Sequence, residues 1–480
     1  MESHTILRYA EYAMPKPPQR VIWITTDHMR HDHIAANGDG GMVTPALDAL
    51  VSKSVNFHNC FAQNPVCMPS RCSFMTGLYP QQTGVTDSGQ CLPADFSPTV
   101  ATAFSAGGYK TAQIGKLHFQ PHVNLDYDPT PRHRYGFDVF WPSESRGVYA
   151  DPYFHWLQSK HAQHSAMFRT PRPTDDARGD TEKTPRPIDA PWQASHAGWI
   201  VETASDFLKM RKSDRLFMHL GMFNPHPPLT PVKQAWDCYK DRAPAPPRRY
   251  AEEWKDKPEP LVGMLKARQS WSDAEILAYR KGLAAMVTEA DLAIGWFVEQ
   301  LRARNMLDDT LLVFGSDHGD FAGDHSITQK NAAYYDEVMR VPLVVHWPAG
   351  LGSGRRDVNG LVEMVDVLPT LLSLCGVYVP DAMAGQSYAD SLLSRKEIAG
   401  REDVFAFHGR GQAMLRTAKH KYLRYGPGAE VLYDLSDPGL ECHNRAGDAR
   451  YKLVLDELRD RLLTRTLAIG GGRAPRLHPY

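Results

Sequence analysis

The stretch CMPSRCSFMTG, residues 67–77, combines a cysteine, a proline and an arginine at a predicted helix start. Pro69 suits the first helical position, because its missing backbone N–H has no helical partner there, and SRCSFM continues the turn. Cys67 then lies at a helix N-terminus, where free N–H groups and the helix dipole favour a thiolate or an oxyanion. Arg71, one turn on, carries a guanidinium suited to tetrahedral oxyanions. We therefore expect a reactive, anion-binding site here.

The pattern Cys-x-Pro-Ser-Arg, followed by Thr76 and Gly77, resembles the signature of the sulfatase family, within the alkaline-phosphatase superfamily. Met75 stands where the family usually has leucine, and conserves its bulk. The resemblance implies that a formylglycine-generating enzyme oxidises Cys67 to formylglycine, whose hydrated aldehyde is the nucleophile. The alternative for Cys67 is a buried structural thiol, the usual state of a free cysteine.

The composition limits the classes of partner. A chain of 480 residues is long enough for one large core and a smaller unit. Lysine and arginine number 54 against 55 aspartates and glutamates, so the net charge of -1 gives no global field that attracts nucleic acid or an acidic membrane. The cysteines, an odd number of 7, include no CxxC pair and so indicate no zinc or redox motif. We expect a reduced, cytoplasmic compartment.

The N-terminal residues 1–20 carry Glu2, Arg8 and Glu11 where a signal peptide needs an apolar run. No stretch in the chain is long and apolar enough to span a membrane. We expect a protein without a cleaved signal and without a membrane segment, with twin-arginine or partner-assisted export as the alternative. Residues 1–20 form either a disordered arm or a contact with another subunit. Together with the family precedent, this arm favours a homo-oligomer.

Candidate metal ligands follow two predicted strands. Residues 21–26 are a short apolar and β-branched run that ends at Asp27, and the apolar run 311–314 is followed by Asp317 and His318. The carboxyl ends of parallel strands form the edge where open α/β sheets bind ligands. An isolated aspartate at a strand end is usually a turn or helix cap, but a second such end favours a site for a divalent cation.

The resemblance implies the same ligands. Sulfatase-like enzymes bind one divalent cation through positions that match Asp27, Asp317 and His318, together with the formylglycine made from Cys67. Many members have a second aspartate beside the first and an asparagine after the third. Here Thr26 precedes Asp27 and His318 replaces the asparagine, as in the choline-sulfatase and phosphonate-monoester-hydrolase branches. We expect Ca²⁺, with Mn²⁺ as the alternative.

Further candidate residues follow two other predicted strands and one loop. Residues 109–114 are followed by Lys116 and His118, which we expect to face the same side of an extended segment. His226 follows a core strand in a proline-fixed loop that matches the family's Pro-His-x-Pro segment. Lys330 matches the family's active-site lysine, although Gln329 precedes it here. The resemblance implies catalytic roles for Cys67, Arg71, Lys116, His118, His226 and Lys330.

The chain is predicted to be α/β: an alkaline-phosphatase-like large mixed sheet flanked by helices, with a small C-terminal antiparallel sheet and helix. We divide it into the arm 1–20, a catalytic domain 21–395 and a C-terminal subdomain 396–480. The segment 120–195 is an irregular insertion, which we expect either to select the leaving group or to be a structural excursion. Residues 272–302 form the longest predicted helix, with a capping box at Ser272.

The reaction implied by the resemblance is hydrolysis of a sulfate monoester to an alcohol and inorganic sulfate. The metal, Arg71, Lys116 and Lys330 supply positive charge for the oxyanions, and His226 protonates the leaving oxygen. His118 then takes a proton from the second hydroxyl of the former aldehyde. The first alternative is a phosphonate monoester or phosphodiester hydrolase, because the same charges hold tetrahedral phosphorus. The second is a non-catalytic relative that binds metal or anions.

Overall fold

The computed structural model describes residues 15–38, 41–121, 133–145, 150–168, 183–212, 214–250, 253–266, 271–409, 411–437 and 441–470. Most of the predicted arm 1–20 therefore lies outside the described residues, as do parts of the predicted insertion 120–195. Among the helices that are described, none combines the length and apolarity that crossing a bilayer requires.

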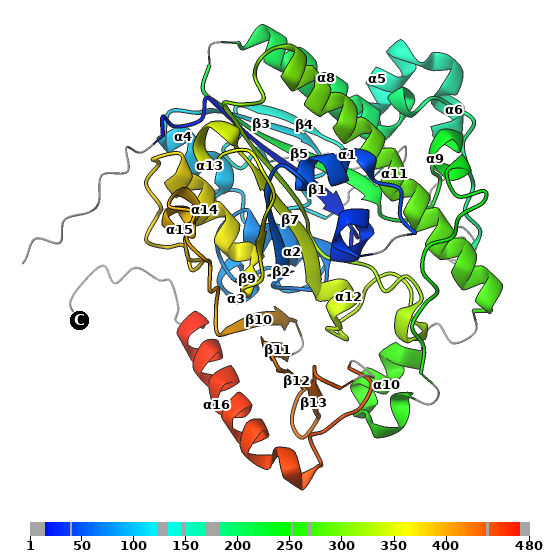
Figure 1. Cartoon of the computed structure of the whole chain (residues 1–480), viewed down its shortest axis with the longest axis vertical. Coiled ribbons are helices and arrows are strands. Elements are labelled where there is room, and N and C mark those ends of the chain that lie inside the picture. Colours follow the sequence, from blue (N-terminus) through cyan, green and yellow to red (C-terminus); the bar gives the residue numbers. More distant parts are fainter. Residues whose placement is uncertain are drawn as a thin grey trace, which may run out of the picture.

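A mixed sheet of 9 strands forms the centre of the molecule, in the order β4-β3-β5-β1-β6-β7-β2-β8, with β9 paired to β2 (Figure 1). The first five of these strands run parallel, and β7 is antiparallel to both of its neighbours. The strands are β1 Arg20–Asp27, β2 Val55–Phe61, β3 Lys110–Gly115, β4 Val139–Pro142, β5 Leu216–Pro225, β6 Thr310–Ser316, β7 Arg340–His346, β8 Arg356–Val358 and β9 Val362–Glu363.

Both faces of the sheet are buried, as the apolar run at β1 predicts. Val21 and Trp23 of this strand pack into one core, while Ile22 and Ile24 pack into the other. Helices from different parts of the chain cover each face, and α8 and α11 run side by side across one of them (Figure 1). That face carries α1 Pro45–Val51, α8 His196–Met210, α9 Lys233–Asp237 and α11 Asp273–Ala303, and the other carries α2 Cys67–Phe74, α4 Val100–Ala106 and α14 Val367–Leu374.

The long helix α11 has the predicted capping box, in which Ser272 accepts a hydrogen bond from the backbone N–H of Glu275. The shorter helices lie in the connections between strands. They are α3 Pro80–Thr83, α5 Pro152–Lys160, α6 Ser165–Phe168, α10 Glu259–Lys266, α12 Asp336–Met339, α13 Pro348–Leu351 and α15 Ala389–Leu393. The segment 120–195, predicted to be irregular, contains β4, α5 and α6, so that expectation was wrong for its described part.

Helix α2 begins two residues earlier than the sequence predicted. Cys67 is its first residue and Val66 its N-cap, so Pro69 is the third helical residue rather than the first. The first helical hydrogen bond joins the N–H of Ser70 to the carbonyl of Val66. The first-turn N–H groups have no helical partner, so a proline at the third position costs the helix nothing. The predicted place of Cys67 at the N-terminus of a helix is confirmed.

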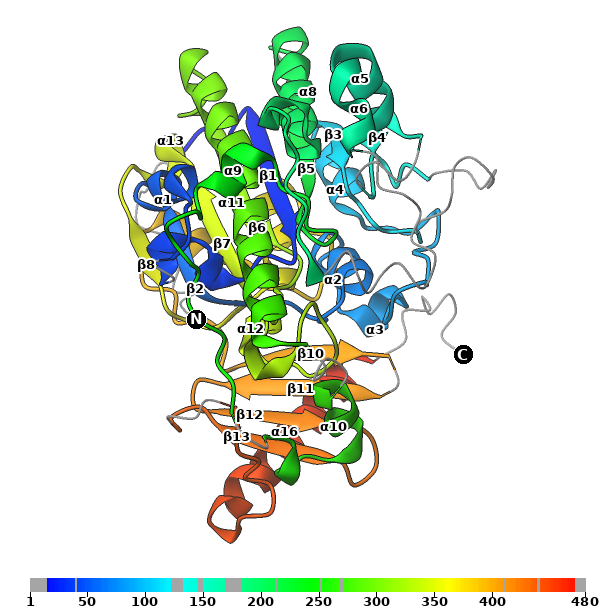
Figure 2. The same ribbon diagram turned by 90° about the vertical axis from the view of Figure 1, so that its right-hand side faces the viewer.

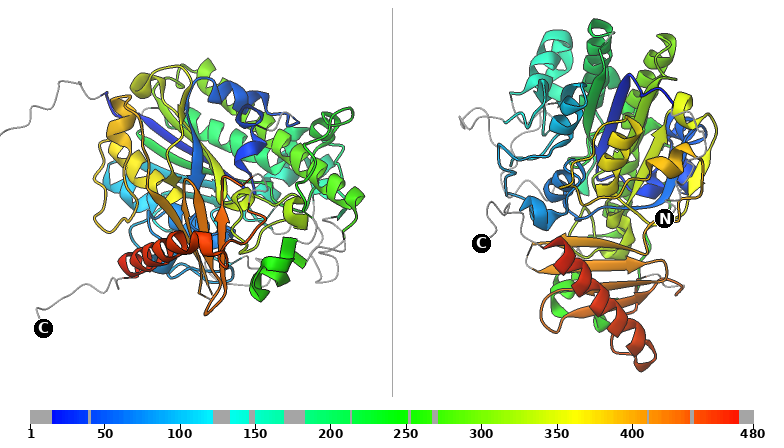
Figure 3. Two further views of the ribbon diagram at one scale, coloured as in Figure 1. Left: turned by 60° about the horizontal axis from the view of Figure 1, so that its bottom comes forward. Right: turned by 90° about the vertical axis from the view of Figure 1, so that its left-hand side faces the viewer.

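A second, antiparallel sheet of 4 strands lies beyond one end of the large sheet (Figure 2). Its strands are β10 Asp403–His408, β11 Gln412–Thr417, β12 His420–Arg424 and β13 Glu430–Asp434. Helix α16, Lys452–Ile469, lies across one face of this sheet (Figure 3) and buries Leu455, Leu458 and Leu462 against it. The predicted fold class, a large mixed sheet with a small antiparallel sheet and helix, is confirmed. The boundary at residue 395 stays a prediction.

Buried ion pairs join the two sheets. Glu363 at the end of β9 is fully buried and accepts hydrogen bonds from Arg465 of α16 at 2.8 Å and from Phe405 of β10 at 2.6 Å. The hydroxyl of Tyr79 also donates to Glu363. A buried carboxylate with this many donors is stable only while all of them stay in place. The small sheet is therefore fixed to the large one.

We expect Gly221→Ala to destabilise the fold. Gly221 of β5 accepts a hydrogen bond from the N–H of Lys116 at 2.7 Å, and a Cβ there would lie 1.9 Å from the carbonyl oxygen of Lys116. Separating these two strand ends should lower the free energy of unfolding by about 1–3 kcal/mol, measured by urea denaturation. The control is Gly263→Ala in α10, where nothing lies within 4 Å and alanine should be neutral or stabilising. Equal effects of both substitutions would contradict the prediction.

Candidate active site

The predicted metal ligands meet at the carboxyl edge of the large sheet. Asp27 is the last residue of β1, Asp317 and His318 directly follow β6, and Cys67 begins α2. One ligand atom from each of these four residues lies within 4.8 Å of the others, and all four side chains are buried. Residues from three separate segments of the chain therefore form one cluster, as the sequence predicted.

His318 is oriented as a metal ligand. Its Nδ1 lies 2.7 Å from the carbonyl oxygen of Gly319, so Nδ1 carries the proton and donates it. When the ring is neutral, Nε2 has the lone pair that can bind a cation, and this atom lies 3.3 Å from Sγ of Cys67 and 3.7 Å from Oδ1 of Asp27. A histidine that binds a metal through one ring nitrogen usually donates the other N–H in this way.

Asp27 has a buried carboxylate oxygen that is available to a cation. Lys116 Nζ lies 2.5 Å from Oδ2, whereas Oδ1 is buried and has no hydrogen-bond donor among the described residues. Burial opposes the charge of this carboxylate, but the cations Lys116 and Arg71 outweigh it and hold the pKa of Asp27 well below its usual value. The donor set of two carboxylates, an imidazole and the residue at 67 fits a divalent cation.

Arg71 binds the protein rather than facing an open site. Its Nε donates to Oδ2 of Asp317 at 2.7 Å, and its two terminal nitrogens donate to the carbonyl oxygens of Lys116 and Thr26 at 3.1 and 3.2 Å. The side chain is fully buried. The sequence suggested that this guanidinium binds the ligand's oxyanion; its described contacts instead fix three strand ends and one metal ligand. Lysine has no planar fork and could not replace these contacts.

Lys116 reaches the cluster from β3, but the segment after it is not extended as predicted. His118 has a φ of 62°, and the N–H groups of Leu117 and His118 both donate to Oε1 of Glu144, at 3.4 and 3.0 Å. The expectation that Lys116 and His118 face one side because they alternate on a strand was therefore wrong. Both side chains are buried at the same strand end. The catalytic role of His118 stays a prediction.

Lys330 and His226, from different loops, lie together. The ammonium of Lys330 is 3.2 Å from Nε2 of His226 and 2.5 Å from Nε2 of His28. Nδ1 of His226 donates to the carbonyl of Pro227, so its Nε2 accepts the proton of Lys330. Burial, reinforced by the charge of Lys330, holds the pKa of both imidazoles well below its usual value. Both histidines are therefore neutral beside a charged lysine.

Three members of the site were missed from the sequence. His28 Nδ1 donates to Oδ2 of Asp320 at 2.8 Å, and the hydroxyl of Tyr279 donates to the same oxygen at 2.8 Å. This chain of hydrogen bonds connects α11 to Lys330 through His28. The sequence could have indicated His28, because it directly follows Asp27 and must therefore lie at the same carboxyl edge of the sheet. Tyr279 fits the apolar stripe of α11 and gave no separate signal.

The positive charges also act on Cys67. Burial and the charge of Asp27 raise the pKa of its thiol, but Lys330, Lys116 and His318 outweigh them and leave that pKa below the usual value. Burial lowers the pKa of His318, whereas Asp317 and Cys67 raise it, to about 9. The site is therefore arranged to hold negative charge at the side chain of residue 67.

A second group of possible metal ligands lies outside this cluster and comprises Glu253, His325 and Cys442. Here Nδ1 of His325 lies 2.8 Å from Oε1 of Glu253, and the hydroxyl of Tyr335 donates to the same oxygen. The hydrogen bonds already satisfy this carboxylate, in contrast to Asp27. These contacts fix His325 within its own loop.

The chain is similar in sequence and in fold to known enzymes over most of its length. A family model described as sulfatase matches residues 19–377, and one described as the C-terminal part of N-sulphoglucosamine sulphohydrolase matches residues 323–467. An arylsulfatase of Clostridium perfringens is 27% identical over 480 residues, which cover 92% of this chain and 93% of that protein. An ulvan-active sulfatase of Formosa agariphila is 29% identical, with 93% and 81% covered. The crystal structure of a phosphonate monoester hydrolase of Agrobacterium radiobacter has a TM-score of 0.80 at 22% identity, with 95% and 96% covered.

We expect Ca²⁺ or Mn²⁺ to raise the Tm of the wild-type chain, and Asp27→Asn to abolish that rise. Ligand that binds only the folded state stabilises it by about 2.7 kcal/mol at roughly 100 times Kd. An amide at position 27 removes the charge of the unsatisfied Oδ1 and so weakens the cation site. The measurement is the Tm shift between chelated and metal-loaded protein. Glu253→Gln is the control, because it changes the second group of possible ligands and leaves the Asp27 cluster intact. Loss of the Tm shift in this control would refute the assignment of the cation site to Asp27.

Proposed function

Because the chain belongs to the sulfatase family and is a sulfuric ester hydrolase, we propose that it hydrolyses a small sulfate monoester with a nucleophile made from Cys67. The predicted family is confirmed, since the family model matches residues 19–377. The observation that carries the proposal is the position of Cys67, which begins α2 within 4.8 Å of Asp27, Asp317 and His318. A helix N-terminus beside two carboxylates and an imidazole suits a nucleophile oriented next to a cation.

Formylglycine at position 67 requires oxidation of Cys67 by a formylglycine-generating enzyme. In that form, Sγ of Cys67 marks the place of an oxygen of the hydrated aldehyde. The two hydroxyls of this group would provide one oxygen to attack sulfur and a second whose deprotonation releases sulfate, so that no separate water has to attack the ester. The lowered pKa of the Cys67 thiol supports the proposal, because the same cations would favour a negatively charged oxygen there.

One divalent cation would be held by Asp27, Asp317, His318 and the modified residue 67. Such a cation supplies positive charge to the ester oxygens and lowers the pKa of a hydroxyl. Arg71 orients Asp317 through the 2.7 Å hydrogen bond between Nε and Oδ2, and Lys116 fixes Asp27. These two cations therefore act as positioning residues for the metal ligands. Oxygen ligands favour Ca²⁺, while the imidazole is compatible with Mn²⁺.

The leaving oxygen needs a proton, and the pair of Lys330 and His226 can deliver it. Lys330 is charged and donates toward Nε2 of His226 at 3.2 Å, so a proton can pass from the ammonium to Nε2 and from Nε2 to the leaving oxygen, which leaves the lysine neutral. His28 keeps the ammonium in place through its own Nε2 at 2.5 Å. We assign the second proton transfer, from the remaining hydroxyl of residue 67, to His118, which is buried at the neighbouring strand end.

A phosphonate monoester or phosphodiester hydrolase is the second candidate. The fold similarity to a phosphonate monoester hydrolase, with a TM-score of 0.80, and the presence of His318 after Asp317 favour it. The same charges would hold tetrahedral phosphorus as well as sulfur. For either substrate we propose a cytoplasmic homo-oligomer without a nucleic-acid partner.

We expect Cys67→Ala to lower kcat/KM for 4-nitrophenyl sulfate by about 1,000-fold or more, because it removes the nucleophile. The protein should be co-expressed with a formylglycine-generating enzyme. The peptide containing residue 67 should then be about 18 Da lighter than the unmodified peptide, as replacement of a thiol-bearing carbon by an aldehyde requires. Cys238→Ser, at an exposed cysteine, is the control and should leave both readouts unchanged. Full activity with an unmodified Cys67 would exclude formylglycine chemistry.

We expect an aryl sulfate to be hydrolysed with a higher kcat/KM than the matching aryl phosphonate monoester. The measurement compares 4-nitrophenyl sulfate with 4-nitrophenyl phenylphosphonate on the same formylglycine-containing protein, so the leaving group is constant. A preference of several hundredfold for phosphorus, about 3–4 kcal/mol in transition-state binding, would reverse the assignment. Cys67→Ala serves as the blank for both substrates.

A further inference from the structure

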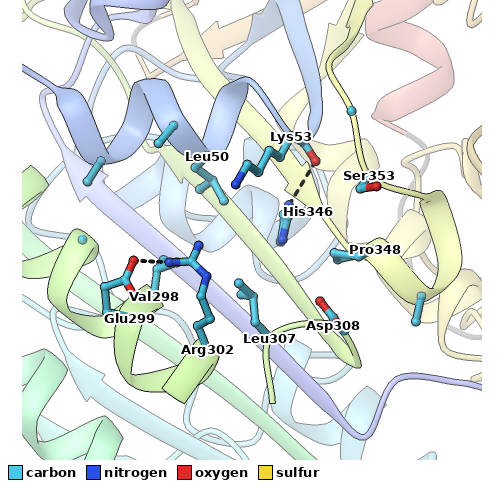
Figure 4. Close-up of a pocket in the computed structure, with 15 residues that line it drawn as sticks. Leu50, Lys53, Val298, Glu299, Arg302, Leu307, Asp308, His346, Pro348 and Ser353 are labelled. Atoms are coloured by element: carbon cyan, nitrogen blue, oxygen red, sulfur yellow. Dashed lines mark hydrogen bonds and ion pairs between the residues drawn. The ribbon is translucent and has the colours of Figure 1, made fainter. Parts of the chain in front are cut away.

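A pocket of about 880 Å³, shown in Figure 4, lies next to the start of β6 and so at the end of the large sheet opposite the candidate active site. It opens between α1, the last turns of α11 and the segment from β7 to α13. Asp308, just before β6, and His346, the last residue of the antiparallel β7, both line it. Strand β6 spans 7 residues between this pocket and Asp317, a separation of about 20 Å at 3.3 Å per residue. The pocket is therefore distinct from the metal-ligand cluster.

His346 places a hydrogen-bond acceptor in this pocket. Its Nδ1 lies 3.2 Å from the carbonyl of Lys53 and 3.0 Å from Oγ of Ser54, whose own hydroxyl proton is donated to Leu50. A carbonyl only accepts, so Nδ1 carries the proton and Nε2 has a free lone pair. Nε2 is buried, has no partner among the described residues and is directed into the pocket (Figure 4). Burial also lowers the pKa of His346, which keeps the ring neutral.

Two cations and one further acceptor surround this imidazole. The side chains of Lys53 and Arg302 extend into the pocket from α1's end and from α11 (Figure 4). Arg302 pairs with Glu299, while Lys53 forms no ion pair with any described residue. The carboxylate of Asp308 lies on the same wall as His346. Within the described part of the chain, the pocket therefore offers an unpaired ammonium at Lys53 for an anion, a buried imidazole acceptor that lacks a donor, and an exposed carboxylate that can also accept from a hydroxyl group.

The floor of the pocket is apolar. Small residues along its walls, such as Ala46 and Gly295, leave space for a ligand above this floor. Leu50 and Leu307 are buried there, and Val298 adjoins them. Gly295 of α11 faces Ala46 of α1, where an added Cβ would lie 2.8 Å from the alanine methyl group. A larger side chain at position 295 would narrow the gap between the two helices. Sites for small molecules commonly have this volume and this combination of apolar floor and few polar groups.

We propose that this pocket binds a hydroxyl-bearing anion of the size of an acidic sugar. Lys53 and Arg302 would bind its carboxylate or sulfate group, His346 and Asp308 would accept from its hydroxyls, and the leucines would contact its C–H face. A purely apolar ligand would leave the Nε2 lone pair of His346 buried without a donor. A simple inorganic anion would satisfy the two cations but neither acceptor. The inference does not depend on the proposed reaction.

The test is binding of D-glucuronate to the full chain, measured by isothermal titration calorimetry. We expect saturable binding that Lys53→Ala and Arg302→Ala each weaken by about tenfold, since both are charged contacts on exposed side chains that the fold does not need. His346→Phe removes the acceptor and should weaken binding by a similar factor, with an unchanged Tm as evidence of folding. The control is Lys209→Ala, at an exposed lysine of α8 that pairs with Asp206 and lies outside the pocket.

Two ligand controls test the two halves of the proposal. D-glucose retains the hydroxyls without the charge, and inorganic sulfate retains charge without the hydroxyl donors; both should bind at least about tenfold more weakly than D-glucuronate. Glucose 6-sulfate separates a sulfate group from a carboxylate as the preferred anion. The kcat/KM for 4-nitrophenyl sulfate should stay the same in all pocket variants, which distinguishes this site from the active site. Absent binding, or binding that all three pocket variants retain, would overturn the proposal.

Discussion

The candidate active site depends on one buried charge network at the carboxyl edge of the large sheet. Lys116 lies 2.5 Å from Asp27, and Arg71 lies 2.7 Å from Asp317, with all four side chains almost completely buried. Buried charges are stable only when they are paired and hydrogen-bonded, so each of these groups requires its partner. Through Arg71, the network also joins the ends of β1, β3 and β6 to the second turn of α2. The geometry around Cys67 is therefore a property of the whole sheet edge.

The sequence predicted the parts of this edge that depend on local pattern. The apolar run before Asp27 and the one before Asp317 each indicate a buried strand, and a parallel sheet brings such strand ends together. The capping box at Ser272 and the leucines of α16 likewise follow from helical spacing alone. These features are encoded within a few consecutive residues. They could therefore be read before the fold was known.

Other features depend on contacts between distant segments and could not be read from local pattern. The direction of Arg71 is set by carbonyl groups of Thr26 and Lys116, and nothing near Arg71 in the sequence identifies them. The turn at His118 is fixed by Glu144, which lies 26 residues further along the chain. His28, Asp320 and Tyr279 form one chain of hydrogen bonds, although Tyr279 lies in an apolar helical stripe. Alternation and periodicity contain no information about such pairings.

The burial of Cys67 has a consequence for the order of events in the life of the protein. The side chain is 3% exposed, and α2, which carries it, buries Met68, Cys72 and Phe74 in the core on one face of the large sheet. The active site of a modifying enzyme cannot bind a backbone segment that is already folded and buried in this way. If residue 67 is modified by another enzyme, that enzyme must find the segment while it is still extended, during or soon after synthesis. Maturation and folding would then compete in time, and a chain that folds first would keep its thiol.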